Sequence, residues 1–157
     1  MAKRYYVAYG SNLNVLQMQM RCPTATVVGT AMLEGWELLF KGSKTGSYLT
    51  IEQCPGEEVP VAVWAVTAKD EAALDRYEGC PTFYYKKDIK LKCKQWRKGT
   101  TKELTAFVYI MHEDRPIGIP SRTYLRTCAD GYYDFNFDDK YLAKAYLKSK
   151  EGYNGDD

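Results

Sequence analysis

The sequence contains few of the residues on which metal centres and histidine-based active sites depend. His112 is its only histidine, and its five cysteines include no C-x-x-C pair. Zinc sites need clustered nitrogen and sulfur ligands, and an odd number of widely spaced cysteines does not indicate a disulfide framework. We therefore expect reduced thiols, no bound metal ion and no cofactor. The cysteines are Cys22, Cys54, Cys80, Cys93 and Cys128.

The chain also lacks a marked excess of one charge and any long apolar run. Its 22 lysines and arginines nearly balance its 20 aspartates and glutamates, which leaves a formal charge of +2. Nucleic-acid binding usually depends on a broad positive field, so no nucleic-acid partner is expected. No stretch approaches the roughly 20 apolar residues of a membrane-spanning helix. These features predict a cytoplasmic protein with no membrane partner.

The sequence does contain enough apolar surface for one folded domain. Of its 157 residues, 45% are hydrophobic and 14% aromatic, and 14 residues are tyrosines. A chain of this length can bury well over half of the surface that its unfolded form exposes. We expect a single domain over residues 1–151 and a flexible tail over residues 152–157.

Extended segments dominate the middle of the chain. Residues 85–95 alternate between an apolar face and a lysine-rich face, and residues 104–111 suit an antiparallel partner. Gly29 and Gly35 interrupt an apolar stretch, as glycines do at bends and bulges. A sheet this long in a short chain tends to curl and protect its edges. The prediction is an α+β fold, with a mixed, mainly antiparallel sheet curled into a small barrel with flanking helices. The other predicted strands cover residues 4–9, 25–40, 47–52 and 59–67, the last two joined by a turn at Cys54-Pro55-Gly56.

Four helices are predicted from apolar spacing and capping residues. The first follows Gly10 and carries Leu13, Leu16 and Met20 at helical spacing. The second covers residues 70–78, with Asp70 as its cap and Gly79 just past its end. The third runs from a Ser121 cap through Cys128, and the fourth begins at Asp138 or Asp139 with Tyr141, Leu142 and Ala145 facing inward.

The turn at Tyr9-Gly10-Ser11-Asn12 is a candidate ligand-binding segment. A strand that enters a helix through a glycine turn exposes the first N–H groups of the helix, which attract anions and polarised carbonyls. Gly10 permits a close approach to the backbone, and Ser11 or Asn12 can cap the helix. The plainer interpretation, which four residues alone favour, is a routine capped connection. The spacing of a nucleotide-binding phosphate loop is missing.

Glu78 occupies an unfavourable position for a carboxylate. It lies about 40° from Leu74 on the helical wheel, given roughly 100° per residue, and so at the edge of the core face. It also lies in the last turn, where the helix dipole disfavours negative charge. Both effects raise the pKa of a carboxyl and suit a general acid/base. The alternative is a glutamate that faces solvent or pairs with a lysine of the next strand.

Three segments together resemble the gamma-glutamylcyclotransferase family. They are Tyr6-Val7-Ala8-Tyr9-Gly10-Ser11-Asn12-Leu13, Leu74-Asp75-Arg76-Tyr77-Glu78-Gly79 and Pro120-Ser121-Arg122-Thr123-Tyr124, and the likeness covers nearly the whole chain. The resemblance implies a barrel-like fold, Glu78 as the catalytic residue and Tyr124 as a pocket residue. It also implies that a small γ-glutamyl compound is converted to 5-oxoproline. The substrate-binding residues that it implies in the first segment are Tyr6, Val7, Ala8, Tyr9, Gly10 and Ser11, to which we add Asn12 of the turn.

Two other functions fit parts of the sequence. Cys80 could serve as the nucleophile of an amidohydrolase, although only His112 is available as its histidine base. The lysines between residues 86 and 98 could instead dock an acidic partner and make the chain a binding module. The sequence leaves open which amine is released and whether the protein forms a homodimer.

Overall fold

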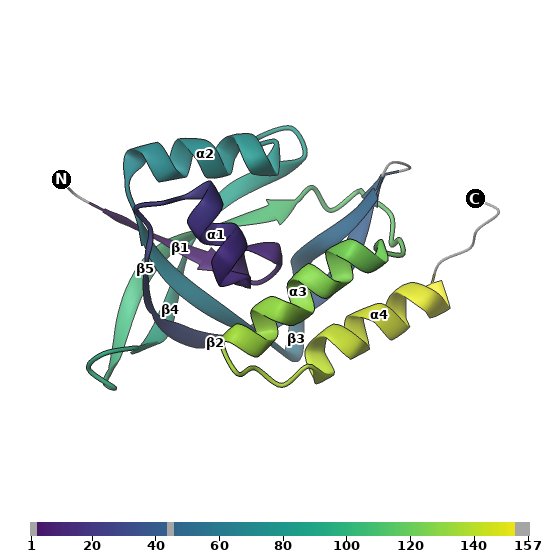
Figure 1. The fold of residues 1–157 in the computed structure, drawn as a ribbon. Helices are drawn as coiled ribbons and strands as arrows, with labels where there is room; N and C mark the ends of the chain where they lie inside the picture. Colours follow the sequence, from purple (N-terminus) through teal and green to yellow (C-terminus); the bar gives the residue numbers. More distant parts are fainter. Residues whose placement is uncertain (1–2, 44–45, 153–157) are drawn as a thin grey trace.

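A computed structural model describes residues 3–43 and 46–152 of the chain. The predicted flexible tail lies almost wholly outside these residues. The strands and helices alternate irregularly along the sequence (Figure 1). In chain order they are β1 (Arg4–Ala8), a 3₁₀ turn (Ser11–Leu13), α1 (Val15–Arg21), β2 (Thr26–Ser43), β3 (Gly46–Val66), α2 (Ala68–Glu78), β4 (Tyr84–Gln95), β5 (Thr101–Met111), α3 (Arg122–Asp134) and α4 (Lys140–Gly152).

The five strands form a closed barrel in the order β1-β3-β2-β4-β5. Neighbouring strands are antiparallel except β1 and β5, which run parallel and close the barrel where Tyr6 pairs with Phe107. Closure gives each strand a paired neighbour on both sides over part of its length. The predicted α+β class and the curled, mainly antiparallel sheet are confirmed.

The long β2–β3 ladder bends at glycines. Its register shifts between Val27 and Gly29 and again at Gly35, which has a φ of +84°. The predicted division of β3 at Cys54-Pro55-Gly56 is wrong, because one strand passes through this segment. The ladder steps from the pair Glu34–Glu58 to the pair Trp36–Gln53, so the turn-forming residues make a bulge rather than a hairpin.

Local capping chemistry fixes the ends of α2. Thr67, not Asp70 as predicted, is the N-cap: its hydroxyl accepts from the Asp70 N–H at 3.2 Å, while the Asp70 carboxylate accepts from the Thr67 N–H at 3.1 Å. Asp70 is therefore the reciprocal partner in a capping box, one turn inside the helix. Gly79 ends the helix with a left-handed φ of +61°, as predicted.

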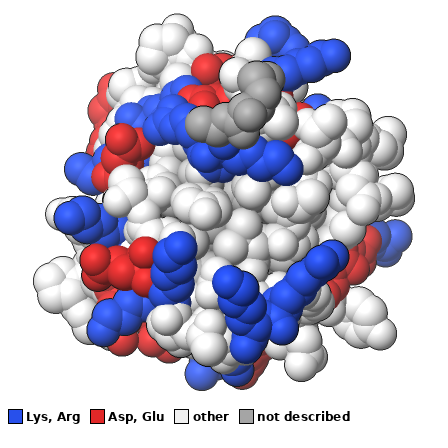
Figure 2. Space-filling model, turned by 90° about the vertical axis from the view of Figure 1, so that its left-hand side faces the viewer, with Lys and Arg blue, Asp and Glu red and all other residues white. Residues whose placement is uncertain are grey.

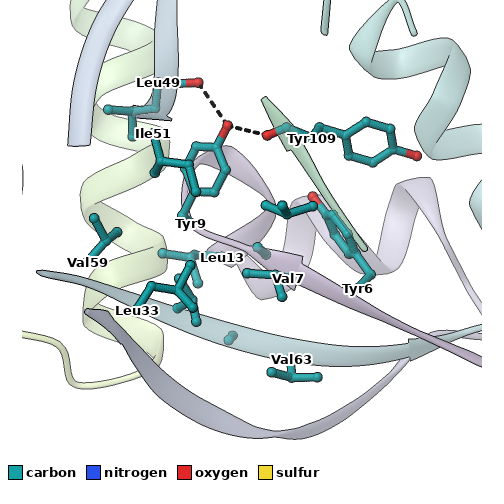
Figure 3. Close-up of a cluster of buried hydrophobic side chains, with 14 of the residues drawn as sticks. Tyr6, Val7, Tyr9, Leu13, Leu33, Leu49, Ile51, Val59, Val63 and Tyr109 are labelled. Atoms are coloured by element: carbon teal, nitrogen blue, oxygen red, sulfur yellow. Dashed lines mark hydrogen bonds between the residues drawn. The ribbon is translucent and has the colours of Figure 1, made fainter. Parts of the chain in front are cut away.

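The core fills the barrel and the spaces beneath the helices. Val7, Val63 and Val59 are fully buried within it, and Figure 3 shows them with Tyr6 and Tyr9. Outside the barrel, α4 packs on β2 through Leu142 and Ala145, as predicted, and α3 packs on the 3₁₀ turn. No helix within the described ranges is both long and apolar enough to cross a bilayer.

Helix α1 departs from the predicted apolar stripe. Met18 is its buried residue, whereas Leu16 and Met20 are 67% and 74% exposed. The 3₁₀ turn explains the difference, because it separates Leu13 from the helix and changes which face of α1 meets the barrel.

Candidate active site

The last turn of α2 brings Glu78 to the edge of a cavity. Leu74, one turn earlier on the same side, is fully buried, and Gly79 turns the chain away immediately afterwards. No lysine or arginine of the described chain forms an ion pair with Glu78. The carboxylate is therefore placed where its charge is poorly compensated.

This environment changes the protonation of Glu78. Burial raises the pKa of Glu78 to about 7, against a smaller lowering effect of the Arg21 guanidinium. The residue keeps partial contact with solvent because it borders the cavity. A carboxyl with such a pKa can take up and release a proton near neutral pH.

The turn after β1 presents backbone donors to the same cavity. The N–H of Leu13 donates to the Gly10 carbonyl, and the N–H of Asn14 donates to the Ser11 carbonyl, both at 3.0 Å. The N–H groups of Ser11 and Asn12 have no acceptor among residues 3–43 and 46–152. These two amides are available to a ligand.

The side chains of the turn are held by tyrosines and do not cap the helix. Ser11 Oγ lies 3.1 Å from Tyr77 Oη, and Asn12 Nδ2 donates to Tyr6 Oη at 2.9 Å. The cap of α1 is Asn14, so the prediction of Ser11 or Asn12 in that role is wrong. The reason is the 3₁₀ turn, which delays the start of the helix and leaves both side chains free for other contacts.

A cavity of about 340 Å³ joins the turn to Glu78. This volume lies at the small end of ligand pockets and suits a compact substrate. Aromatic rings form most of its wall, which supplies a rigid surface with hydroxyl groups at defined points. The lining residues are Tyr6, Tyr9, Gly10, Ser11, Asn12, Tyr48, Leu49, Tyr77, Glu78, Phe83, Tyr84, Tyr109 and Tyr124.

Three of these hydroxyls are fixed by backbone groups of the barrel. Tyr9 donates to the Tyr109 carbonyl at 2.7 Å, as the dashed line in Figure 3 marks. Tyr84 donates to the Leu49 carbonyl at 2.7 Å, and Tyr124 Oη accepts from the Leu49 N–H at 3.0 Å. Burial raises the pKa of these three phenols and of the Tyr109 phenol, so all four remain neutral at physiological pH.

A family model described as "Gamma-glutamyl cyclotransferase, AIG2-like" matches residues 6–133 of the chain, a range that contains both the turn and Glu78. The chain belongs to this family.

Individual relatives agree with the family assignment. Proteins named gamma-glutamylcyclotransferase from Mus musculus and Homo sapiens are 29% and 30% identical to it over 160 residues, which cover 96% of this chain and 81% of each relative. A solved structure titled "Gamma-glutamyl cyclotransferase" is 28% identical, with a TM-score of 0.72 over 99% of this chain and 90% of that one. The comparisons confirm the family and the class of enzyme predicted from the sequence.

The structure gathers most of the predicted site residues of this cyclotransferase-family chain. Val7 and Ala8 are the exceptions, since both are buried in the core and neither borders the cavity. They support the turn from the strand below it. The predicted residues that do line the cavity are Tyr6, Tyr9, Gly10, Ser11, Asn12, Glu78 and Tyr124.

Six residues that line the cavity were not predicted from the sequence. Tyr77 is one of them, and it is 46% exposed and borders the cavity. Its position directly before Glu78 in the sequence is the one feature from which its place in the cavity wall could have been predicted. The other lining residues that were missed come from strands that meet only when the barrel closes: Tyr48, Leu49, Phe83, Tyr84 and Tyr109.

The thiol alternative has no geometric support. Cys80 does not line the cavity, and burial and the nearby Asp75 raise the pKa of its thiol, which disfavours the nucleophilic thiolate. His112 is engaged elsewhere, with Nε2 2.7 Å from the Pro81 carbonyl oxygen. Within the described ranges, no three histidine, cysteine or acidic side chains gather as a metal-binding group.

The lysine-rich strand of this family member does not form a uniform positive stripe. Lys86 is paired with Glu71 at 2.6 Å and with Asp75 at 2.9 Å. Lys87 and Lys90 are exposed, but they point to opposite faces of β4 because three residues separate them on the strand. On the face shown in Figure 2, basic and acidic side chains are interspersed around an uncharged area. A solvated surface explains this distribution.

Proposed function

We propose that this chain releases 5-oxoproline from a γ-glutamyl amine or peptide, with Glu78 as the general acid/base. The observation that carries the proposal is the meeting, in one cavity, of a carboxyl whose pKa is about 7 and a turn with two unpaired N–H groups. The carboxyl can transfer protons, and the turn can position the substrate and stabilise the negative charge that develops on its carbonyl oxygen.

The nucleophile in this reaction belongs to the substrate. The α-amine of the γ-glutamyl group attacks its own γ-carbonyl carbon, forming the ring C–N bond, and the bond to the leaving nitrogen then breaks. The protein must fold the flexible glutamyl chain until the two atoms are about 3 to 3.5 Å apart. The aromatic wall suits this task because three of its tyrosines are held by hydrogen bonds to the barrel backbone. The side chains of the turn are held in the same way by the hydroxyls of Tyr77 and Tyr6.

Proton transfer is assigned to Glu78. An ammonium group is not nucleophilic, so the ionised carboxylate first accepts a proton from the substrate α-amine. The protonated carboxyl then delivers that proton to the departing nitrogen as its bond to the carbonyl carbon breaks. The ring nitrogen gives its remaining extra proton to the regenerated carboxylate, and the released amine takes up this proton and leaves as an ammonium ion. Catalysis of this kind typically contributes about 10²- to 10⁴-fold.

The N–H groups of Ser11 and Asn12 are assigned to the carbonyl oxygen. This oxygen becomes negatively charged when the amine attacks, and donors fixed beforehand stabilise it without reorganising. Neither amide has an acceptor among the residues that the structure describes, which leaves both available for this role.

Mass spectrometry of 5-oxoproline release from a panel of γ-glutamyl amines, amino acids and peptides tests the proposal. Turnover of at least one compound is expected, and the same compound acetylated on its α-amine should give none, because the attacking nitrogen is blocked. Steady product from the acetylated compound would mean that an external nucleophile attacks. Binding without turnover across the whole panel would favour a binding module.

A further inference from the structure

Arg21 connects the two parts of the site without lining the cavity. It is the last residue of α1, and its guanidinium lies 3.4 Å from the centroid of the Tyr77 ring. The same group donates hydrogen bonds to Asn12 Oδ1 and to Gln17 Oε1. Tyr77 precedes Glu78, and its hydroxyl lies 3.1 Å from Ser11 Oγ.

We propose that Arg21 is a positioning residue: its guanidinium ties Asn12 of the turn to Tyr77 of α2, and so fixes the N–H groups of the turn relative to Glu78. The inference rests on the proposed function, since it concerns the geometry of that reaction. The guanidinium contacts both Asn12 and the Tyr77 ring, and the Tyr77 hydroxyl contacts Ser11, the chain neighbour of Asn12. The four residues therefore form a closed ring of contacts.

The chemistry of arginine suits this position better than that of lysine. A planar guanidinium can stack on an aromatic face while its edge donates several hydrogen bonds in fixed directions. Arg21 does both at once, with Tyr77 against its face and the oxygens of Asn12 and Gln17 at its edge. An ammonium group would supply the charge but not this combination.

Arg21 also carries the one charge of the described chain found to lower the pKa of Glu78. The remaining ionisable groups that interact with this carboxyl are neutral at pH 7, because burial raises the pKa of each. They are the phenols of Tyr6 on β1, Tyr9 just after it, Tyr84 on β4, Tyr109 on β5 and Tyr124 on α3, together with the Cys80 thiol. Loss of the Arg21 charge should therefore raise the pKa of Glu78 further.

Three variants separate positioning, charge and general structural effects. Arg21→Met removes the stack, the hydrogen bonds and the charge; Arg21→Lys keeps the charge; and Arg97→Met removes an exposed arginine from the β4–β5 connection. Each is compared with the wild type in kcat, KM and the pH profile of kcat/KM, using a substrate found in the γ-glutamyl panel.

For Arg21→Met we expect kcat to fall by about 10- to 100-fold, as small misplacements near reacting atoms do. The acid limb of kcat/KM should also move to higher pH. Arg21→Lys should return the limb towards its wild-type position with only partial recovery of kcat, and Arg97→Met should match the wild type.

Wild-type kcat in Arg21→Met would overturn the inference. So would a lower kcat with an unmoved acid limb, because that result indicates a purely structural role. If the wild type turns over no compound, the proposed function fails separately. The inference is then decided by NMR titration of the Glu78 carboxyl, where equal midpoints in wild type and Arg21→Met overturn it and a higher midpoint in the variant supports it.

Discussion

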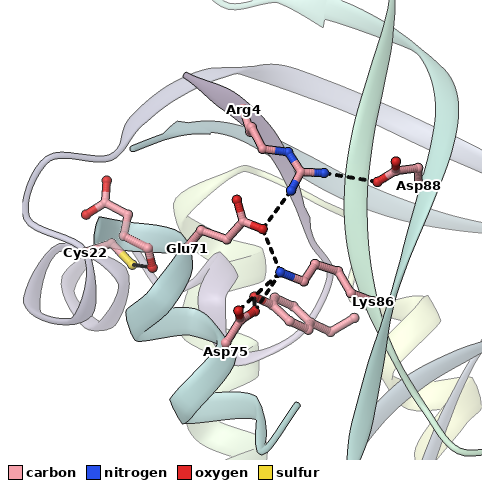
Figure 4. Close-up of polar contacts among 8 residues, drawn as sticks. Arg4, Cys22, Glu71, Asp75, Lys86 and Asp88 are labelled. Carbon is pink, nitrogen blue, oxygen red and sulfur yellow. Dashed lines mark hydrogen bonds and ion pairs between the residues drawn. The ribbon is translucent and has the colours of Figure 1, made fainter. Parts of the chain in front are cut away.

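Three carboxylates on one face of α2 occupy contrasting surroundings. Glu71, Asp75 and Glu78 follow one another at intervals of four and three residues, so they share a stripe of the helix. Glu71 accepts from Arg4 at 2.7 Å and from Lys86 at 2.6 Å, and Lys86 also reaches Asp75 (Figure 4). Glu78, at the end of the same stripe, has no such cation among the residues that the structure describes.

The surroundings of each carboxylate, not its residue type, determine whether it stays charged or exchanges a proton near neutral pH. Ion pairs close to solvent stabilise a fold only slightly and keep a carboxylate charged. At the cavity, burial favours the neutral form of Glu78, which gives that group a proton to exchange near pH 7. The helix thus carries both paired surface carboxylates and one candidate acid/base.

The largest predicted effect is on activity, which should depend on Glu78 at one end of this stripe and not on Glu71 at the other. Glu78→Gln should lower 5-oxoproline release by about 10²- to 10⁴-fold, because an amide cannot accept the substrate proton. Glu71→Gln, the matched control on the same helix face, should retain activity within a few-fold. Turnover by Glu78→Gln at the wild-type level would end the assignment of this residue.

The second prediction concerns stability. The pKa of Glu78 is about 7 in the folded protein against an ordinary value of 4.5, so its stabilising contribution is present below pH 4.5 and is lost as the pH rises through 7. Glutamine imitates the neutral form. Glu78→Gln should therefore unfold at higher urea concentration than the wild type at pH 8, by at most roughly 3 kcal/mol, with little difference at pH 4.5. An equal difference at both pH values would contradict the raised pKa.

The smallest predicted effect lies in the ion-pair network. Lys86→Met removes the bridge between Glu71 and Asp75 and should lower the free energy of unfolding by about 1 kcal/mol at low salt. Urea denaturation at low and high salt measures this effect, which should shrink as salt screens the pairs. A loss several times larger would show that these ion pairs contribute more to the free energy of unfolding than ion pairs close to solvent usually do.

Local chemistry made much of the fold predictable. The alternation in β4, the glycine at the end of α2 and the Ser121 cap of α3 are each determined by neighbouring residues. Predictions failed where two local signals competed. A Pro-Gly pair that usually marks a turn lies in a bulge of β3, because the paired strand β2 bends beside it at Gly35.

The candidate site was only partly predictable, for a related reason. Glu78 could be identified because its conflict with the helix end and the core face is visible within one helix. Arg21 could not, because its partners Asn12 and Tyr77 are brought to it by packing between α1, the turn and α2. Tyr84 and Tyr109 likewise reach the cavity only through closure of the barrel.

The most direct test of the account is the pKa of the Glu78 carboxyl itself. It can be followed by carbon-13 NMR in protein labelled at glutamate side chains, with the signal assigned by its absence in Glu78→Gln. The account predicts a midpoint of about 7. A midpoint near the ordinary glutamate value of 4.5 would contradict this prediction.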